Sequence, residues 1–182
     1  MIIVMFGAPG VGKGTQAALL AERKGVHHLS TGEAFRSAIA AGTELGKTAQ
    51  GFVQSGGLVP DEIVTGIVEE AMSKPEFASG AILDGFPRTL GQAQALDMLL
   101  DVQGKSIAHI INITVDNEEI VKRLLLRGRQ DDNEDVIRHR LNVYNEQTAP
   151  LLEYYAGSGK MINIAGDADI ETVYARIEES LR

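Results

Sequence analysis

The stretch that decides the fold runs from Ile2 to Thr15 and reads IIVMFGAPGVGKGT. Its first five residues are all apolar, and Gly7 ends the run. A short, unbroken apolar run is typical of a strand that is covered on both faces, as the strands of parallel sheets are. After the glycine-rich segment, apolar residues return at helical spacing, at Ala17, Leu20 and Ala21. The stretch therefore predicts a strand, a loop and a helix over 13–23 in direct succession.

The rest of the chain repeats this alternation. Further short apolar runs predict strands at 26–29, 80–83, 107–113 and 161–164. Helical spacing of apolar residues predicts helices over 61–72, 117–127, 134–155 and 169–181, and Pro150 is expected to bend the third of them. Strands that alternate with helices form parallel sheets with helices on both faces. We therefore expect an α/β fold of three layers, with a five-stranded parallel sheet, in one domain over 1–182.

Two segments break the alternation. Residues 30–59 contain two short helical patterns with several glycines and no strand-like run. Residues 128–133 form a polar turn that reads GRQDDN. Inserts between regular elements often cover an active site, and we expect these two segments to do so.

Composition and charge exclude several classes of protein. The formal charge of −8, from 17 basic and 25 acidic side chains, argues against general binding to nucleic acid or to membrane surfaces. The absence of cysteine excludes disulfides, a thiolate zinc site and a cysteine nucleophile, and it fits a reducing compartment. No apolar run reaches the ~18 residues of a membrane span, and the first strand lacks the basic leader of a signal peptide. These features predict a cytoplasmic protein with neither nucleic-acid nor membrane partners.

The glycine-rich segment from Gly7 to Thr15 predicts a phosphate-binding loop. Glycines let the backbone approach a ligand closely, and the N–H groups at the start of the following helix attract anions. Lys13 would reach the β and γ phosphates of a nucleotide. The general motif has Ser or Thr directly after the lysine, whereas here Gly14 stands there and Thr15 follows.

A second group of polar residues follows the strand predicted at 80–83. Asp84 comes directly after this apolar run. Beside a phosphate loop such a carboxylate holds Mg²⁺, directly or through water, although alone it would be read as the cap of the next turn. Arg88 lies just beyond, at the carboxyl end of a strand, where ligands bind in open α/β sheets. Its planar guanidinium suits a second phosphate site.

Further arginines cluster in the second half of the chain, at Arg123, Arg127, Arg129 and Arg140. A single arginine is most often a solvated surface residue. A set near a phosphate loop can instead stabilise the charge of a phosphoryl group in transfer. Asp131 and Asp132 have two compatible interpretations, as caps of the following helix or as partners that orient the arginines.

The remaining histidines and tyrosines suggest no site. His27, His28, His109 and His139 share no metal-ligand spacing and are expected to pack or to lie on the surface. The tyrosines of the helix predicted at 134–155 are expected to pack against the core rather than to stack on bases.

Taken together, the motifs resemble those of the adenylate kinase family over nearly the whole chain. The segments that carry this resemblance are Gly7–Thr15, Leu29–Gly32, Gly57–Asp61, Asp84–Thr89 with Gln92, and Asp131–Glu134. Gly14-Thr15 after the lysine is itself the pattern of that family. The resemblance implies reversible, Mg²⁺-dependent transfer, ATP + AMP = 2 ADP, in adenine nucleotide homeostasis and purine nucleotide biosynthesis or salvage. It also implies a monomer.

The resemblance assigns roles to individual residues. It implies an ATP site made of Gly10, Val11, Gly12, Lys13, Gly14, Thr15, Arg123, Arg127 and the main chain of Ala168. It implies an AMP site made of Thr31, Arg36, Gly57, Leu58, Val59, Gly85, Phe86, Pro87, Arg88, Gln92, Arg129 and Arg140, with Gln92 reading the adenine edge. Catalysis would rest on Lys13, Asp84, Arg88, Arg127, Arg129 and Arg140. Thr15 and Asp84 would hold Mg²⁺, through water, and no structural zinc is expected.

The resemblance also divides the chain and shows where it departs from the family. Residues 30–59 correspond to the monophosphate-binding insert and residues 126–133 to a lid. The stretch 128–133 is shorter than even the usual short lid, which bears on how well closure excludes water. Glu33 stands where Asp is commoner.

Three rival functions stay open at this point. A UMP or CMP kinase would tend to have alanine at Thr31 and an altered segment at 84–89, whereas this chain has the adenylate form. The sequence decides less about GTP as the phosphoryl donor, because the donor base is read largely by backbone groups. A GTP-dependent switch would need an Asn-Lys-x-Asp motif, which the sequence lacks.

Overall fold

The central sheet has five parallel strands. A computed structural model describes residues 1–182 and places the strands in the order β2-β3-β1-β4-β5. They are β1 (Ile2–Phe6), β2 (His27–Ser30), β3 (Ala81–Asp84), β4 (Ile107–Thr114) and β5 (Met161–Ala165). All four neighbouring pairs are parallel. The predicted α/β class and the five strands are thus confirmed, with strand ends shifted by at most one residue.

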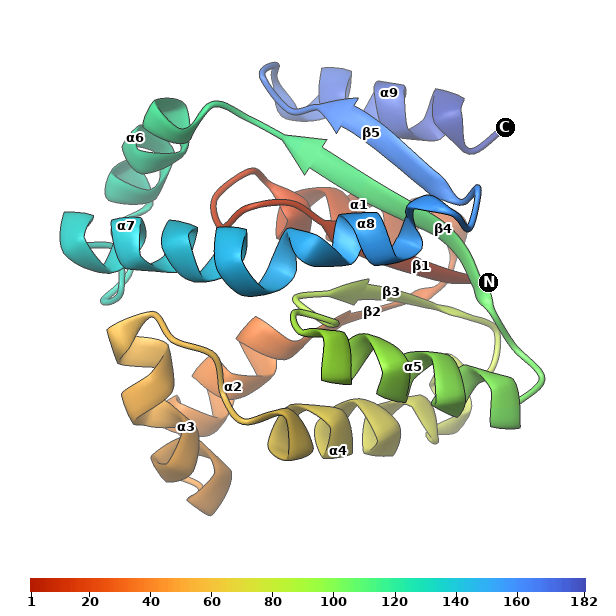
Figure 1. Cartoon of the computed structure of the whole chain (residues 1–182), viewed down its shortest axis with the longest axis horizontal. Helices are drawn as coiled ribbons and strands as arrows, with labels where there is room; N and C mark the ends of the chain where they lie inside the picture. Colours follow the sequence, from red (N-terminus) through yellow and green to blue (C-terminus); the bar gives the residue numbers. More distant parts are fainter.

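Helices cover both faces of this sheet (Figure 1). Side chains of β1 alternate between two buried clusters, with Val4 and Phe6 in one and Ile3 and Met5 in the other. The first cluster includes residues of α4 (Asp61–Met72), α5 (Leu90–Val102) and α8 (Pro150–Ala156). The second includes residues of α1 (Lys13–Lys24), α6 (Asn117–Arg127), α7 (Glu134–Val143) and α9 (Ile170–Ser180). A three-layer arrangement follows, as the sequence predicts.

Two helical features differ from the sequence-based expectation. Helix α5 is absent from the predicted helices, although Ala93, Leu96 and Leu100 are buried along one face of it. The helix predicted over 134–155 is two helices, α7 and α8, joined by a π-helical turn, η2 (Tyr144–Thr148). In this turn the N–H of Ala149 donates to the carbonyl oxygen of Tyr144, five residues back. The irregularity predicted at Pro150 therefore falls in the turn before it.

The segment between β2 and α4 forms a small helical unit beside the sheet. Helices α2 (Thr31–Ala40) and α3 (Glu44–Ser55) lie together at one end of the molecule in Figure 1. Ser30 and Thr43 cap them, each accepting a hydrogen bond from a backbone N–H three residues on. A short 3₁₀ turn, η1 (Pro75–Phe77), follows α4. No helix in the structure combines the length and apolar character that a membrane span requires.

The parallel register brings the first two motifs together. Met5 of β1 pairs with Asp84 of β3, and Ser30 of β2 pairs with Asp84 from the other side. The loop after β1, the start of α2 and the loop after β3 therefore leave the sheet at the same edge. Strand β1 is central, with β3 and β2 on one side and β4 and β5 on the other, so this edge includes a topological switch point, where ligands bind in such folds.

Gly46 determines how closely α2 and α3 approach. A Cβ atom at this position would overlap the backbone of Ala38 and Ile39. We expect Gly46→Ala to lower the free energy of unfolding by about 1–3 kcal/mol, because the two helices must separate. Gly51→Ala is the matched control, since Gly51 lies on the same helix with open space around it. It should stabilise the protein by about 0.5–1 kcal/mol through helix propensity. Urea unfolding of both variants measures these changes. Equal effects of the two substitutions would contradict the role assigned to Gly46.

Candidate active site

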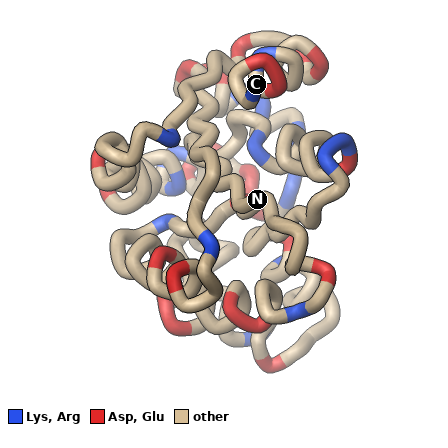
Figure 2. Tube along the Cα trace, turned by 90° about the vertical axis from the view of Figure 1, so that its right-hand side faces the viewer, with Lys and Arg blue, Asp and Glu red and all other residues tan.

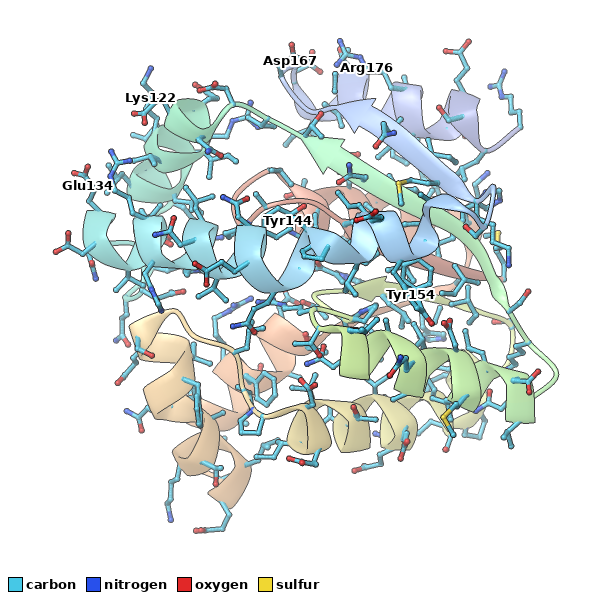
Figure 3. All side chains as sticks on the ribbon, viewed as in Figure 1. Lys122, Glu134, Tyr144, Tyr154, Asp167 and Arg176 are labelled. Atoms are coloured by element: carbon cyan, nitrogen blue, oxygen red, sulfur yellow. The ribbon has the colours of Figure 1, made fainter.

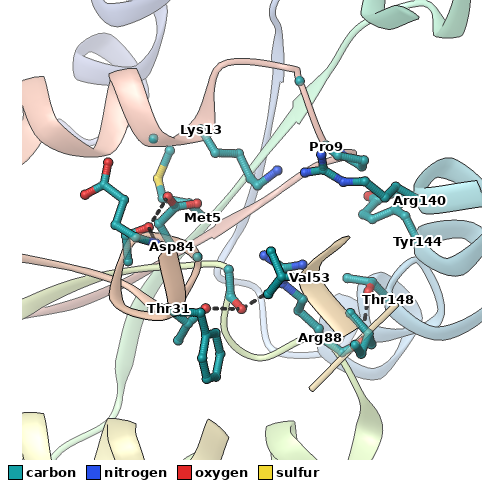
Figure 4. A pocket seen from close by; sticks show the side chains of 18 of the residues that line it. Met5, Pro9, Lys13, Thr31, Val53, Asp84, Arg88, Arg140, Tyr144 and Thr148 are labelled. Carbon is teal, nitrogen blue, oxygen red and sulfur yellow. Dashed lines mark hydrogen bonds between the residues drawn. The ribbon is translucent and has the colours of Figure 1, made fainter. Parts of the chain in front are cut away.

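A deep cavity of about 560 Å³ opens at this edge of the sheet. Its walls come from the loop after β1, from α2, from the end of α3, from the loop after β3 and from α7 with η2. Figure 4 shows Lys13 and Arg140 directed into the same space, with Arg88 and Thr31 on the other wall. The cavity is therefore built from segments that are far apart in the sequence.

The loop after β1 has the form of an anion site. Helix α1 begins at Lys13, and no side chain caps its first N–H groups, which leaves them free for a ligand. Gly10 has a φ of 90°, and a Cβ there would lie 2.8 Å from Cγ of Leu124, so only glycine fits. The Nζ of Lys13 donates to the carbonyl oxygens of Gly7 (2.7 Å) and Ala8 (2.8 Å). Lys13 thus lies across the concave side of the loop.

Opposing effects act on the pKa of Lys13. Burial lowers the pKa of Lys13 to about 8, and the cations of Arg88, Arg140 and Arg127 act in the same direction. Asp84 opposes these effects. Lys13 is therefore a cation at neutral pH that titrates within reach of ordinary assay conditions.

Asp84 is the acidic centre of the cavity. Its Oδ2 accepts from Ser30 Oγ at 3.2 Å and lies 3.6 Å from Nε2 of His28. Burial pushes its pKa up, but His28, Lys13 and Arg88 outweigh burial and hold the pKa below its usual range. A Cβ at Gly14 would lie 3.3 Å from this carboxylate, which explains why glycine stands where the general motif has Ser or Thr.

The donor set around Asp84 fits a magnesium ion that is held partly by substrate. No group of three or more His, Asp or Glu side chains forms a protein cage for a metal. Thr15, with its exposed hydroxyl, and the ionised Asp84 both line the cavity. One carboxylate and one hydroxyl, completed by water and phosphate oxygens, is a usual arrangement for Mg²⁺.

The loop after β3 fixes Arg88 firmly. The carbonyl oxygen of Gly85 accepts from Thr31 Oγ1 (2.8 Å) and from Arg88 Nε (2.9 Å). The carbonyl oxygen of Arg88 accepts from Thr148 Oγ1 at 2.9 Å. Burial lowers the pKa of the Arg88 guanidinium, and Asp84 partly offsets this effect. The guanidinium is thus held at the base of the cavity by neighbours that touch its stem and backbone.

Two buried carboxylates orient the arginines of the opposite wall. Asp132, whose side chain is 0% exposed, accepts from Nε (2.8 Å) and Nη2 (2.6 Å) of Arg127. Asp131 accepts from Nη1 of Arg140 at 2.7 Å. The cap of α7 is Asn133, which accepts from the N–H of Val136. Of the two interpretations of Asp131 and Asp132, the structure supports orientation of the arginines.

Most of the predicted site residues line this one cavity. These are Gly10, Gly12, Lys13, Gly14, Thr15, Thr31, Arg36, Gly57, Leu58, Val59, Asp84, Gly85, Pro87, Arg88, Gln92, Arg127, Arg129 and Arg140. Val11 and Phe86 are buried in the core beside it instead. Arg123 and Ala168 also lie outside its lining, and Arg123 donates to the carbonyl oxygen of Gly166, two residues before Ala168, at 3.1 Å.

Sequence reasoning missed three residues at this site. His28 was expected to be an ordinary packing or surface residue, yet it lies beside Asp84. Tyr144 was expected to pack in the core, yet it lines the cavity (Figures 3 and 4). Thr148 carried no signal at all, because its role depends on the π-helical turn that directs it at Arg88. By contrast, Tyr154 is exposed and bonds to Asp97, away from the cavity.

The cavity concentrates positive charge in an acidic protein. Lys13, Arg36, Arg88, Arg127, Arg129 and Arg140 all line it, although the chain carries a formal charge of −8. In Figure 2, acidic positions are frequent on the helices at the top and bottom, whereas basic positions are scattered across the middle. Such a local field attracts polyanions of small size.

The pairing of Asp132 predicts a specific loss of stability. We expect Asp132→Ala to lower the free energy of unfolding by about 2 kcal/mol, because Arg127 and the N–H of Arg129 lose a charged acceptor. Asp135→Ala is the control, since Asp135 is exposed on the first turn of α7, and it should cost only about 0.5 kcal/mol.

The difference in unfolding free energy between wild type and Asp132→Ala should change with pH in one direction. The pKa of Asp132 is held below its usual range, against the effect of burial, by Arg127 and the N–H of Arg129. A lowered folded-state pKa gives stability above the ordinary value, near pH ~4, that is lost as pH falls through the folded value. The gap between wild type and Asp132→Ala should therefore shrink below pH ~4. A gap that is constant with pH in urea unfolding would contradict the assignment.

Comparison with known proteins agrees with the geometry. The sequence model of the family described as "Adenylate kinase" matches residues 5–160. The chain is 48% identical over 180 residues to "Adenylate kinase 1" of Synechocystis sp., covering 99% of this chain and 96% of the relative. It is 48% identical over 181 residues to an adenylate kinase of Mycobacteroides abscessus, with 100% and 99% coverage. An adenylate kinase of Parabacteroides distasonis is 45% identical over 183 residues, with 98% and 96% coverage. The chain therefore belongs to the adenylate kinase family.

Proposed function

We propose that this chain catalyses reversible transfer of the γ-phosphoryl group of ATP to AMP, which gives two molecules of ADP. Family membership and the names of the relatives support this reaction. The observation that carries it is one cavity lined by two cationic groups suited to phosphate, Lys13 and Arg88, with the carboxylate of Asp84 acting on the charge of both.

The donor, ATP, is assigned to the side of the cavity formed by the loop after β1. The free N–H groups at the start of α1 and the Nζ of Lys13 would bind its β and γ phosphates. Arg127 would contact the same phosphates. The base would lie near Arg123 and the main chain of Ala168, and the bond from Arg123 to Gly166 holds Arg123 at the segment that leads to Ala168.

The acceptor, AMP, is assigned to the side formed by residues 30–59, which we propose act as the monophosphate-binding insert. Arg88 and Arg36 would bind its phosphate, and Gly57 to Val59 would lie along the nucleoside. Gln92, at the base of this side, would face the adenine. Residues 126–133, the proposed lid, include Arg127 and Arg129, which line the cavity and would contact the phosphates of both nucleotides.

Thr15 and Asp84 would hold Mg²⁺ together with water and phosphate oxygens. When bound, the ion supplies positive charge that neutralises the phosphates as the bond to the leaving group breaks. The residues of the chain do the rest. Lys13, Arg88, Arg127, Arg129 and Arg140 keep both nucleotides in line and stabilise the charge that develops on the transferred group.

The transfer itself needs no side-chain nucleophile. An oxygen of the AMP phosphate attacks the γ phosphorus of ATP, a new P–O bond forms, and the bond between the γ phosphorus and the β–γ bridging oxygen breaks. The bridging oxygen leaves with the electron pair as part of ADP. Because the products are two ADP molecules, the same residues serve the reverse direction.

We also propose that the protein acts as a monomer in the cytoplasm, in adenine nucleotide homeostasis and purine nucleotide biosynthesis or salvage. The monomer is what the resemblance to the adenylate kinase family implies. The lack of cysteine fits a reducing compartment.

An acceptor panel tests the reaction. Purified protein with Mg·ATP should convert AMP at least ~100-fold more efficiently than UMP or CMP, measured as kcat/KM for diphosphate formation. Arg88→Ala should lower kcat by ~100-fold or more, because a fixed cation at the transferred group is lost. Arg138→Ala is the control, since Arg138 is exposed and bonds to Glu134 outside the cavity. A preference for UMP or CMP would contradict the assignment of AMP as the acceptor. A parallel series with GTP in place of ATP tests the assignment of the donor.

The pKa of Lys13 predicts the alkaline limb of the pH profile. The protonated amine binds phosphate, so the competent form is present below pH about 8 and is lost as pH rises through that value. We expect kcat/KM for ATP to fall above this pH by about tenfold per unit, since this parameter reports pKa values of the free enzyme. Lys13→Arg should be less active but should lack this limb, because guanidinium stays charged. A flat wild-type profile to pH ~9.5 would contradict the role of Lys13.

A further inference from the structure

We propose that Asp61 fixes the orientation of the Gln92 side-chain amide and thereby sets the preference of the acceptor site for 6-amino purines over 6-oxo purines. This inference rests on the proposed function, in which Gln92 faces the base of AMP. Asp61 does not line the cavity, so it acts through Gln92 as a positioning residue.

The Gln92 amide is held at both ends. Its side chain lines the cavity while the residue is only 1% exposed. Its Oε1 accepts from the backbone N–H of Arg88 at 2.8 Å, and its Nε2 donates to Oδ1 of Asp61 at 2.8 Å. A backbone N–H can only donate and an ionised carboxylate can only accept. Only one of the two possible orientations of the amide therefore satisfies both neighbours.

Asp61 is itself held in place. It is the first residue of α4, where the helix dipole favours a carboxylate. Its Oδ2 accepts from Thr89 Oγ1 at 2.7 Å, and the same hydroxyl accepts from the N–H of Gln92 at 3.2 Å, at the start of α5. A Cβ at Gly91 would lie 2.9 Å from Oδ2 of Asp61, so the glycine leaves room for the carboxylate.

A fixed amide distinguishes purines by hydrogen-bond polarity. After its two protein bonds, Gln92 retains one N–H donor and one oxygen lone pair. A 6-amino purine presents an acceptor at N1 beside a donor at N6, and a 6-oxo purine presents a donor at N1 beside an acceptor at O6. With the phosphate held by Arg88, one orientation of the amide matches the first pattern and the reversed orientation matches the second. The mismatched base leaves buried polar groups unpaired, which costs about tenfold to hundredfold in binding.

The competing explanation is that Asp61 only joins α4 to α5. It predicts that loss of Asp61 lowers stability and changes kcat/KM for every acceptor by the same factor. The polarity explanation predicts a change in the ratio of kcat/KM for AMP to that for IMP, which is a 6-oxo purine monophosphate of the same shape. This ratio is the readout that separates the two explanations.

The first variant is Asp61→Asn. An amide at position 61 can present either oxygen or nitrogen to Gln92, so the reversed orientation becomes more accessible. We expect the AMP-to-IMP ratio to fall about tenfold, mainly through KM, because the N–H of Arg88 alone still favours the original orientation. Thr89→Val is the control. It removes the bond to Oδ2 of Asp61 and the cap of α5 but keeps the carboxylate whose Oδ1 accepts from Gln92, so it should lower thermal stability and leave the ratio unchanged.

The second variant exchanges the two groups, Asp61→Asn with Gln92→Glu. The amide at position 61 then donates to the carboxylate at position 92 and accepts from Thr89, and the carboxylate accepts from the N–H of Arg88. Every hydrogen bond between protein groups is kept, but position 92 now offers only acceptors to the base. Each base then has one donor matched and one acceptor opposed, so the double variant should lose the preference for AMP, with a ratio of kcat/KM values near one.

The outcomes separate this inference from the proposed function. An unchanged ratio in Asp61→Asn, or a retained preference for AMP in a folded double variant, overturns the role of Asp61. Failure of the wild type to phosphorylate AMP overturns the proposed function instead. Dissociation constants for AMP and IMP from titration calorimetry give the same ratio without turnover, so Asp61 is tested in either case. Thermal unfolding of each variant shows whether it is folded.

Discussion

The parallel pairing of β1 with β3 is the constraint on which the site depends. Its register sets Met5 opposite Asp84, so the phosphate loop and the acidic strand end leave the sheet side by side. The two strands pair through their backbones and are covered on both faces, since all five residues of β1 are buried. A slip of one residue would exchange the side chains of β3 between faces. The register therefore fixes where the loop that carries Lys13 and the strand end that carries Asp84 leave the sheet.

A second requirement is to keep cations close together without a ligand. The carboxylate of Asp84 opposes the effect of burial on Lys13 and Arg88, while Asp132 and Asp131 pair with Arg127 and Arg140. Each pair uses a carboxylate that is less exposed than its arginine, so the acid is the fixed partner. The guanidinium groups thus remain directed at the cavity, and little reorganisation is needed when phosphates arrive.

Local sequence predicted what depends on local pattern. The strand–loop–helix at the start of the chain and the five strands follow from periodicity and motifs, whereas most of the predicted cavity residues follow from the resemblance to the family. Helix α5 was missed although its buried face repeats at helical spacing. Tyr144 and Thr148 were missed because a π-helical turn changes which side of a helix faces inward, and one inserted residue per turn leaves no periodic signal. The pairing of Asp61 with Gln92 joins two helices, so no single segment encodes it.

Several glycines of the site act by the space that they leave. A Cβ at Gly85 would lie 2.8 Å from both Thr31 Oγ1 and Arg88 Nη2, and one at Gly56 would lie 2.7 Å from Cγ of Arg140. Gly14 and Gly91 leave room for the carboxylates of Asp84 and Asp61 in the same way. Each missing side chain thus lets a neighbouring side chain approach the backbone more closely than a residue with a Cβ would permit. The motifs that carry the resemblance include Gly14 and Gly85 but not Gly56 or Gly91, so the role of the last two follows from the structure alone.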